Sequence, residues 1–238
     1  MARVLDVFQS SHQTYGYRRI TICLQVQQGM RINHKSVLRL MNKLGIRSVA
    51  RKRRVFRKLA ELDGFHRYPN LLARDFTATR PNQKWVTDVT YIQTQQGMAY
   101  LSTIKDLFDG FIVAHQFGRD HSIGLVTGTI RLAKRKEKPA DGLILHSDQG
   151  SQYTSDPYHV LTAACGITPS MSRRGNCWDN APMENFFGHL KEEAIRRFKN
   201  PSFQEARQII DEYIYFYNYE RIQLKTKQTP YQLRCLSG

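Results

Sequence analysis

The spacing of apolar residues divides the chain into a helical first part and a mixed second part. In the first part, apolar positions recur with a helical period over residues 17–28 and 33–45. Gly29 and Gly45 are suitable helix ends, and Asn33 is a good N-cap for the second helix. Two short helices joined in this way are typical of a helix-turn-helix, and an ordinary helical hairpin with a basic exterior is the alternative.

From Lys84 onward the pattern changes to short apolar and β-branched runs that alternate with amphipathic stretches. A meander of three strands followed by alternating helices and strands predicts a mixed five-stranded sheet with helices on both faces. The predicted strands are 85–92, 98–107, 111–117, 143–146 and 167–170, and the predicted helices are 123–136, 155–165, 179–198 and 202–219. The fold class is therefore α/β, preceded by a small all-α domain.

Positive charge is concentrated in the first third of the chain. The whole chain carries 36 Lys and Arg against 20 Asp and Glu, and residues 1–83 supply a net +13 of the total +16. This excess indicates a polyanionic partner, with nucleic acid first and an anionic membrane surface second. The side chains expected to contact DNA here, rather than only to be solvated, are Arg18, Arg19, Lys35, Arg39, Lys43, Arg51, Lys52, Arg53 and Arg54.

Composition also sets the domain limits. Residues 59–83 contain Gly64, Pro69 and Pro81 and show no sustained period, so we place a linker there. The basic helical domain is then 1–58 and the larger domain 84–238. No apolar run approaches the ~20 residues of a membrane span, and no signal peptide opens the chain. The four cysteines are widely separated, as reduced thiols of a cytoplasmic protein are.

Three acidic residues occupy positions where catalytic groups are commonly found. Asp88 lies inside the first predicted strand, Asp148 directly follows the fourth, and Glu184 lies in the first turns of a long helix. A charged residue in an apolar strand is costly unless it is paired or binds a metal, and ligands bind at the carboxyl ends of strands in α/β sheets. Each also has a simple alternative: an outward-facing strand residue, a turn residue, and a helix N-terminal Glu favoured by the dipole.

The spacing of these residues and the sequence motifs around them resemble those of a known superfamily. Sixty positions separate Asp88 from Asp148, and 35 residues lie between Asp148 and Glu184. The supporting stretches are KWVTDVTYI (84–92), HSDQGSQY (146–153), MSRRGNCWDNAPMENFFG (171–188), YNYERI (217–222) and TPY (229–231), with YGYRRI (15–20) and NHKSV (33–37) ahead of them. The chain resembles the DDE transposases and retroviral-type integrases, and more narrowly the second-reading-frame product of two-frame bacterial insertion sequences.

The resemblance implies a ribonuclease H-like core in which Asp88, Asp148 and Glu184 hold two divalent ions, normally Mg²⁺, with Mn²⁺ able to substitute. Oxygen ligands suit such hard cations. The implied reaction is metal-dependent cleavage of insertion-element ends and strand transfer to target DNA by in-line phosphoryl transfer. Lys191, two turns after Glu184, is expected to contact a phosphate. Arg173 and Arg174 lie in a polar loop that is expected to close over DNA or to be only a mobile basic loop.

Other side chains near these motifs are expected to be structural. We expect His146 to pack or to form hydrogen bonds beneath the site, because this chemistry favours an all-oxygen metal shell. We expect Trp85 and Trp178 to pack rather than to stack on bases. Asp106 and Asp109 are interpreted as hairpin residues.

The resemblance also implies partners: DNA, further copies of the chain on DNA, and an upstream first-frame product as a fusion or a partner. Relatives have more sequence ahead of Tyr15, so we expect an N-terminally shortened or alternatively started copy in the bacterial cytoplasm, associated with the nucleoid. One alternative function is a truncated, inactive or regulatory DNA-binding remnant of a transposase. Another is a nuclease with the same core that lacks the joining step.

Overall fold

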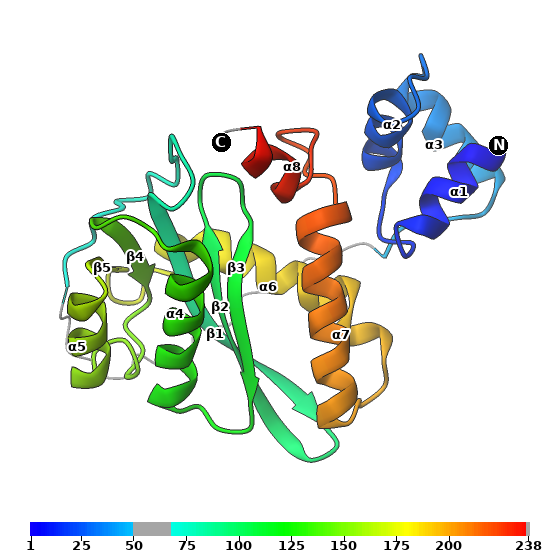
Figure 1. The fold of residues 1–238 in the computed structure, drawn as a ribbon. Helices are drawn as coiled ribbons and strands as arrows, with labels where there is room; N and C mark the ends of the chain where they lie inside the picture. The colour runs from blue at the N-terminus through cyan, green and yellow to red at the C-terminus, as the bar shows by residue number, and fades with distance from the viewer. Residues whose placement is uncertain (50–67, 237–238) are drawn as a thin grey trace.

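The structure, a computed structural model, describes residues 1–49 and 68–236, which form a small helical domain and a larger α/β core (Figure 1). The basic cluster Arg51, Lys52, Arg53 and Arg54 lies outside the described residues. None of the helices within the described residues is both long and apolar enough to span a membrane.

The N-terminal domain has three helices: α1 (Ala2–Ser10), α2 (Tyr17–Val26) and α3 (His34–Lys43). The two predicted helices are confirmed as α2 and α3. The Asn33 side chain accepts a hydrogen bond from the Lys35 amide at 2.8 Å, and Gly29 and Gly45 adopt the positive φ that ends a helix. Helix α1 was not expected, and it supplies Val4, Val7 and Phe8 to the core of this domain.

The core contains the predicted mixed five-stranded sheet in the order β3-β2-β1-β4-β5. The strands are β1 (Lys84–Thr94), β2 (Gly97–Asp106), β3 (Ile112–Gly118), β4 (Leu143–Ser147) and β5 (Ile167–Met171). Strands β1, β2 and β3 are antiparallel, whereas β4 runs parallel to β1 and β5 parallel to β4. The parallel pairing aligns Val86 with His146, so β1 and β4 run side by side toward Asp88 and Asp148.

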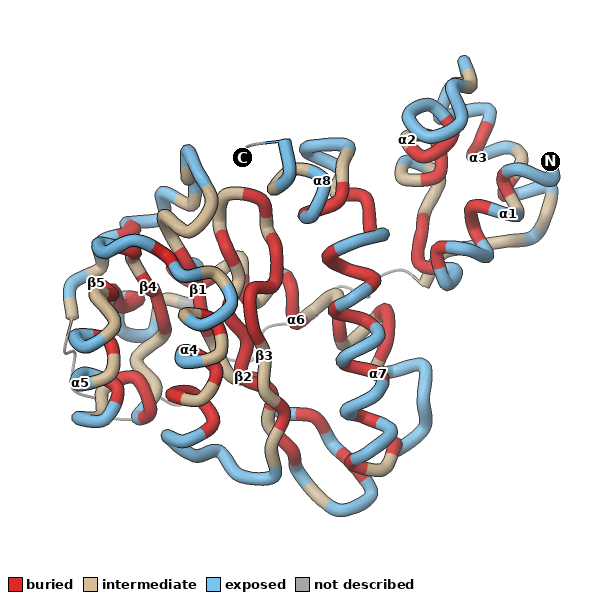
Figure 2. Tube along the Cα trace, in the orientation of Figure 1, coloured by how far each residue is buried: buried red, intermediate tan, exposed pale blue. Residues whose placement is uncertain are grey.

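Helices cover both faces of the sheet, as the sequence predicts (Figure 1). Helices α4 (Ile123–Glu137) and α5 (Asp156–Ala164) pack on one face, in a core that includes Trp85, Ile130 and Leu145. Helices α6 (Ala181–Glu193) and α7 (Phe203–Tyr215) pack on the other, in a core that includes Val86 and Phe186. Figure 2 shows the buried residues running along the strands and the inward sides of these helices.

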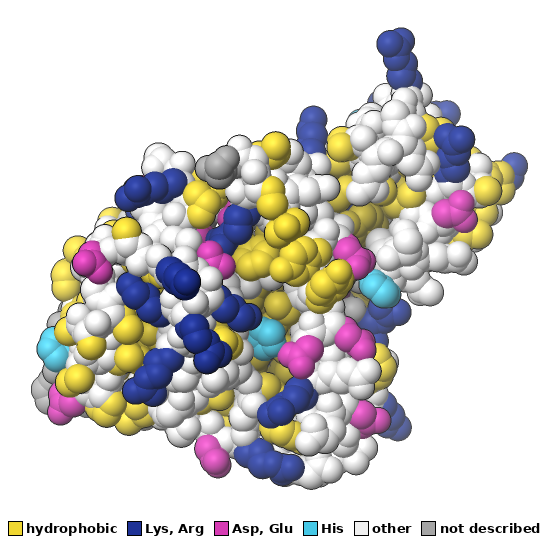
Figure 3. Space-filling model, viewed as in Figure 1, with side chains coloured by type: hydrophobic (Ala, Val, Ile, Leu, Met, Phe, Trp, Pro, Cys, Tyr) yellow, Lys and Arg dark blue, Asp and Glu magenta, His cyan; other side chains and the backbone are white. Residues whose placement is uncertain are grey.

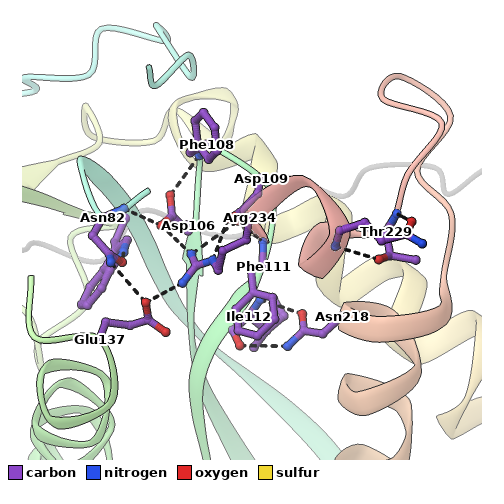
Figure 4. Close-up of polar contacts among 12 residues, drawn as sticks. Asn82, Asp106, Phe108, Asp109, Phe111, Ile112, Glu137, Asn218, Thr229 and Arg234 are labelled. Atoms are coloured by element: carbon purple, nitrogen blue, oxygen red, sulfur yellow. Dashed lines mark hydrogen bonds and ion pairs between the residues drawn. The ribbon is translucent and has the colours of Figure 1, made fainter. Parts of the chain in front are cut away.

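The C-terminal helices are more divided than the apolar period predicts. The helix predicted at 179–198 consists of a 3₁₀ turn (Cys177–Asn180), α6, and a second 3₁₀ turn (Ile195–Arg197). Helix α7 gives way to a π-helical segment, Phe216–Glu220. There the Asn218 side chain bonds both the amide and the carbonyl of Ile112, at 2.8 and 3.0 Å (Figure 4). These two bonds tie the π-helical segment to the start of β3.

Residues 68–83, which fall in the expected linker, lie against the core. The Leu71 amide donates to Ser170 Oγ at 2.9 Å, the Pro69 carbonyl accepts from the Met171 amide at 3.2 Å, and Leu72 is buried. These contacts extend the β5 edge of the sheet with irregular chain.

A short C-terminal helix, α8 (Pro230–Cys235), is fixed to the β2–β3 hairpin by one arginine (Figure 4). The Arg234 guanidinium contacts Asp106 and Asp109 at 2.7 Å each and Glu137 at 2.5 Å. Asp106 and Asp109 are therefore more than hairpin residues, because they anchor the end of the chain.

The N-terminal domain contacts the core at the segment that follows the π-helix. The Tyr15 hydroxyl accepts from the Ile222 amide at 2.8 Å and donates to the Glu220 carbonyl at 3.1 Å. Arg19 Nε donates to the Ile222 carbonyl at 3.1 Å. Beneath this contact, buried Arg221 and Glu193 form a two-pronged ion pair at 2.8 and 2.6 Å.

Candidate active site

Three separate elements bring Asp88, Asp148 and Glu184 to one region of the core. Asp88 lies midway along β1, and Asp148 follows the carboxyl end of β4, which is the parallel neighbour of β1. Glu184 lies in the first turn of α6, which packs on β1. Each of the three residues is half-buried.

The electrostatics of these groups show that they are neighbours. Burial raises the pKa of Asp88 well above its usual value, and the charges of Asp148 and Glu184 raise it further, while Lys191 opposes them. Burial likewise raises the pKa of Asp148, against hydrogen bonding from Gly150 and the charge of His121. Like charges held together in this way are costly, and such clusters are found mainly at functional sites.

Backbone contacts fix two of the carboxylates. Asp88 Oδ1 accepts from the Val89 amide at 2.7 Å, and Asp148 Oδ1 accepts from the Gly150 amide at 2.9 Å. A Cβ atom added at Gly150 would lie only 3.0 Å from that Asp148 oxygen, so any larger residue there would push the carboxylate aside. Asn180 Nδ2 donates to the Thr87 carbonyl at 3.2 Å and ties the start of α6 to the residue before Asp88.

The donor set is the kind that holds a hard divalent cation, because all three candidate ligands are carboxylates. Their mutual repulsion at Asp88 is a cost that a bound cation would remove. Across residues 1–49 and 68–236, however, no group of three or more His, Cys, Asp or Glu side chains is gathered closely enough to hold a metal ion. The donors therefore fit in chemistry, while their arrangement is more open than that of a formed metal site.

The basic residues predicted for the core have partners in the structure. Lys191 Nζ lies 4.5 Å from the centre of the Tyr91 ring, which is exposed on β1. Arg173 binds Asp179 through Nε and Nη2 at 2.9 and 2.8 Å. Arg174 is exposed in the same loop. The guanidinium of Arg173 is therefore a structural clamp of the loop as well as a surface cation.

Asp179 is a residue that the sequence analysis missed. It is fully buried, and besides Arg173 it accepts hydrogen bonds from Arg74 at 2.8 Å and Asn70 at 3.0 Å. The Arg173 hydrogen bonds hold its pKa below the usual range. Its place inside the motif 171–188 was the available signal, but only the fold shows that it joins the loop before α6 to the segment along β5.

Two of the structural expectations are confirmed and one is wrong. His146 is buried and hydrogen-bonded to Ser170 Oγ at 2.8 Å and Ser172 Oγ at 3.1 Å, and burial lowers its pKa to about 4. Trp85 is fully buried, and its Nε1 donates to Asn82 at 3.1 Å. Trp178 does not pack, because 65% of its surface is exposed. The neighbouring Asp179 turns inward in its place.

The described N-terminal residues predicted to contact DNA fall into two groups. Lys35, Arg39 and Lys43 are all exposed on α3, on the side away from buried Val37 and Met41, and Arg18 is exposed on α2. Arg19 instead lies in the contact with the core.

In the core, Lys and Arg side chains gather over the face that carries α4 (Figure 3). The last turn of that helix holds Lys134, Arg135 and Lys136. This surface was not expected, because residues 84–238 as a whole carry only a small net charge.

Comparison with known proteins gives the chain a family. Residues 1–54 match an HTH-like domain, and residues 78–177 and 184–237 match two models described as integrase core domains. The chain is 39% identical to InsK of insertion sequence element IS150 from Escherichia coli (strain K12), over 98% of this chain and 81% of that protein. It is 38% identical to the transposase for insertion sequence element IS904 from Lactococcus lactis, over 92% of this chain and 87% of that protein.

Solved structures share the fold at low sequence identity. The catalytic core domain of HTLV-2 integrase, in complex with magnesium, aligns with a TM-score of 0.54 at 16% identity, over 66% of this chain and 99% of that one. The simian T-cell lymphotropic virus intasome aligns with a TM-score of 0.59 at 15% identity, over 97% and 74%. The core therefore has the integrase, ribonuclease H-like fold. With transposase relatives along nearly its whole length, the chain belongs to the insertion-sequence transposases that join an HTH-like domain to an integrase core.

Proposed function

We propose that this transposase cleaves the ends of its insertion element and transfers them to target DNA, with Asp88, Asp148 and Glu184 as a DDE catalytic triad. The observation that carries the proposal is that three carboxylates from distant parts of the chain lie around β1: Asp88 is on β1, Asp148 follows the parallel neighbour β4, and Glu184 begins the helix that packs on β1. Carboxylates gathered in this way, with the pKa of Asp88 raised, are common at catalytic sites.

The triad would hold two divalent ions, Mg²⁺ by preference and Mn²⁺ as a substitute. Asp88, Asp148 and Glu184 would hold these ions between them, with Asp88 as the carboxylate between the other two. When bound, the ions supply Lewis acidity at the attacking and leaving oxygens of an in-line displacement at phosphorus. Magnesium is present in the similar HTLV-2 integrase core, which supports the choice of metal.

The remaining residues bind and orient DNA. Lys191, beside Asp88, would hold a phosphate next to the carboxylates, with Tyr91 limiting the directions in which its ammonium group can point. Arg174 and the exposed edge of Arg173 would contact the strand from the loop. Lys35, Arg39 and Lys43 on α3, with Arg18, would follow the backbone of an end sequence. His146, whose pKa is lowered, supports the strand ends as a neutral group.

The proposal includes the partners that the family resemblance implies. The chain would act as a homo-oligomer on DNA, as a second-reading-frame product that is fused to, or works with, an upstream first-frame product in the bacterial cytoplasm. The likeness to a protein solved in an intasome supports assembly on DNA.

The test is a cleavage and joining assay with Mg²⁺ on a DNA carrying the element ends. Asp88→Asn, Asp148→Asn and Glu184→Gln should each reduce both products at least 1,000-fold while DNA binding persists, since neutral amides replace the charged ligands. Glu212→Gln, on the exposed side of α7, is the matched control and should keep full activity. Unchanged activity in Glu184→Gln would favour a regulatory DNA-binding protein, and hydrolysed strands without joined target would favour a nuclease.

A further inference from the structure

Trp178 is the exposed one of the two tryptophans in the chain. Its exposed fraction is 65%, whereas that of Trp85 is 0%. An indole offers one of the largest apolar surfaces of any side chain, so leaving it in water gives up a substantial stabilisation. Among the described residues, no aromatic ring or cation lies against the Trp178 ring. Burial within the fold therefore accounts for only the smaller part of this ring's surface.

The backbone that carries this indole is firmly held. Its neighbour Asp179 is fully buried and bound by Arg173, Arg74 and Asn70. The next residue, Asn180, is bound to the Thr87 carbonyl of β1. A ring presented on so fixed a segment loses little conformational entropy when it binds something, which favours a binding role over a chance exposure.

The position of the ring indicates what it binds. The 3₁₀ turn with Trp178 leads directly into α6, and Glu184 follows six residues later. Exposed Arg173 and Arg174 precede it in the same loop. An exposed aromatic ring flanked by cations, beside a phosphoryl-transfer site, matches the chemistry of a nucleobase with its phosphate. An apolar protein surface would offer no negative charge to the two arginines, whereas a phosphate does.

We propose that Trp178 stacks on an unpaired base at the DNA end and thereby positions the adjacent phosphate at Asp88, Asp148 and Glu184. The inference rests on the proposed DNA-cleaving function. Stacking of this kind tolerates any sequence, because every base has a π-face. It requires the terminal base pairs to open, so the site prefers a frayed end to a closed duplex.

Intrinsic fluorescence tests the contact without any chemistry. The full-length protein is titrated, in the absence of divalent ions, with duplexes that end either bluntly or in a three-nucleotide overhang. Because Trp85 is buried, iodide should quench only the Trp178 emission in the free protein, and the overhang duplex should then quench and shield that same emission. Trp178→Phe should remove the iodide-sensitive emission and the response to DNA.

Affinity measured by fluorescence anisotropy gives the second readout. Trp178→Ala should weaken binding of the overhang duplex about 10-fold and binding of the blunt duplex much less. Trp178→Phe keeps a ring and should therefore lose less affinity for the overhang duplex than Trp178→Ala does. Phe198→Ala removes another exposed aromatic ring, 54% exposed, directly after the 3₁₀ turn Ile195–Arg197, and should change neither affinity. Thermal unfolding of each variant checks that the fold is kept.

The outcomes separate this inference from the proposed function. Glu184→Gln should retain the full fluorescence response while losing cleavage, so stacking is measured even where catalysis is absent. Binding of the overhang duplex by anisotropy with no change in Trp178 emission would overturn the stacking contact. Equal weakening of both duplexes in Trp178→Ala would overturn the preference for an unpaired base. Iodide protection that grows with protein concentration would instead assign the ring to contact between copies of the chain.

Discussion

At the residue scale, Asp148 is held by the backbone amide of Gly150, where an added side chain would crowd the carboxylate. The Gly150 amide lies 2.9 Å from Asp148 Oδ1, and a Cβ atom there would lie 3.0 Å from the same oxygen. Gly150→Ala should therefore displace the carboxylate and slow single-turnover cleavage by about 10- to 100-fold with little change in melting temperature. The control is Gly124→Ala in α4, where the nearest atom would be 3.6 Å away. Equal rates for both variants would contradict the prediction.

The repulsion at Asp88 has a consequence for stability. Burial and the charges of Asp148 and Glu184 raise its pKa, so the ionised form of the group destabilises the fold. Asp88→Asn should raise the melting temperature of the metal-free protein by a few degrees, which corresponds to about 1 kcal/mol for a chain of this size. The same variant should lose the extra stability that Mg²⁺ gives the parent protein. A lower melting temperature without metal would show that the charge is compensated.

At the scale of elements, α8 depends on an unbalanced charge cluster. Asp106, Asp109 and Glu137 face the single guanidinium of Arg234 (Figure 4), and burial together with Asp109 raises the pKa of Asp106 from 3.8 to about 6. Between pH 4 and 6 the folded protein thus keeps a proton that the unfolded chain has lost, so this group makes stability fall as pH rises. The shift corresponds to roughly 3 kcal/mol.

Asp106→Asn removes that titration. The free energy of unfolding of the variant, measured by urea between pH 4 and 7, should improve relative to the parent protein by roughly 3 kcal/mol across this range. Asp6→Asn, on the exposed side of α1, is the control, and its free energy of unfolding should differ from that of the parent by the same amount at every pH. A constant difference for Asp106→Asn would mean that Arg234 fully compensates the buried charge.

The elements that could be predicted are those whose own residues determine them. The strands and helices α4, α5 and α7 follow their apolar period and caps; Ser202 and Glu205, for example, form a capping box at the start of α7. The π-helical segment could not be predicted, because it depends on the bonds of Asn218 to a strand about a hundred residues earlier. Helix α8 is six residues long and owes its position to Arg234, so its own apolar pattern is too short to show it.

The same distinction applies to the candidate site. The carboxylates were found because their residue type and spacing are unusual for strands and turns. The environment of Trp178 and Asp179 could not be predicted from the sequence. Two adjacent residues in a loop carry no hydrophobic period that tells which one turns inward. Asp179 is held in its buried position by Arg74 and Asn70, from the segment expected to be a linker, together with Arg173 of its own loop.

At the scale of the whole molecule, the N-terminal domain rests on the part of the core that secures the end of α6. Buried Arg221 forms an ion pair with Glu193, the last residue of α6. Glu193 also accepts a hydrogen bond from the Tyr213 hydroxyl at 2.8 Å. Burial lowers the pKa of Arg19, which lies beside Arg221. The domain that carries the basic α3 surface is thus connected, through Ile222 and Arg221, to the helix that carries Glu184.

The Tyr15 hydroxyl is the centre of this connection, since it bonds both Glu220 and Ile222. Tyr15→Phe leaves those two backbone groups without a partner and should weaken docking of the domain by about 1–3 kcal/mol. In hydrogen exchange the Ile222 amide should exchange at least 10-fold faster, while amides at the centre of β2 keep their protection. Tyr17→Phe removes a hydroxyl whose bond from Arg18 lies within the same domain, and it should leave Ile222 protected. If Ile222 exchanged equally slowly in both variants, the two domains would be held together by Arg19 and apolar packing instead.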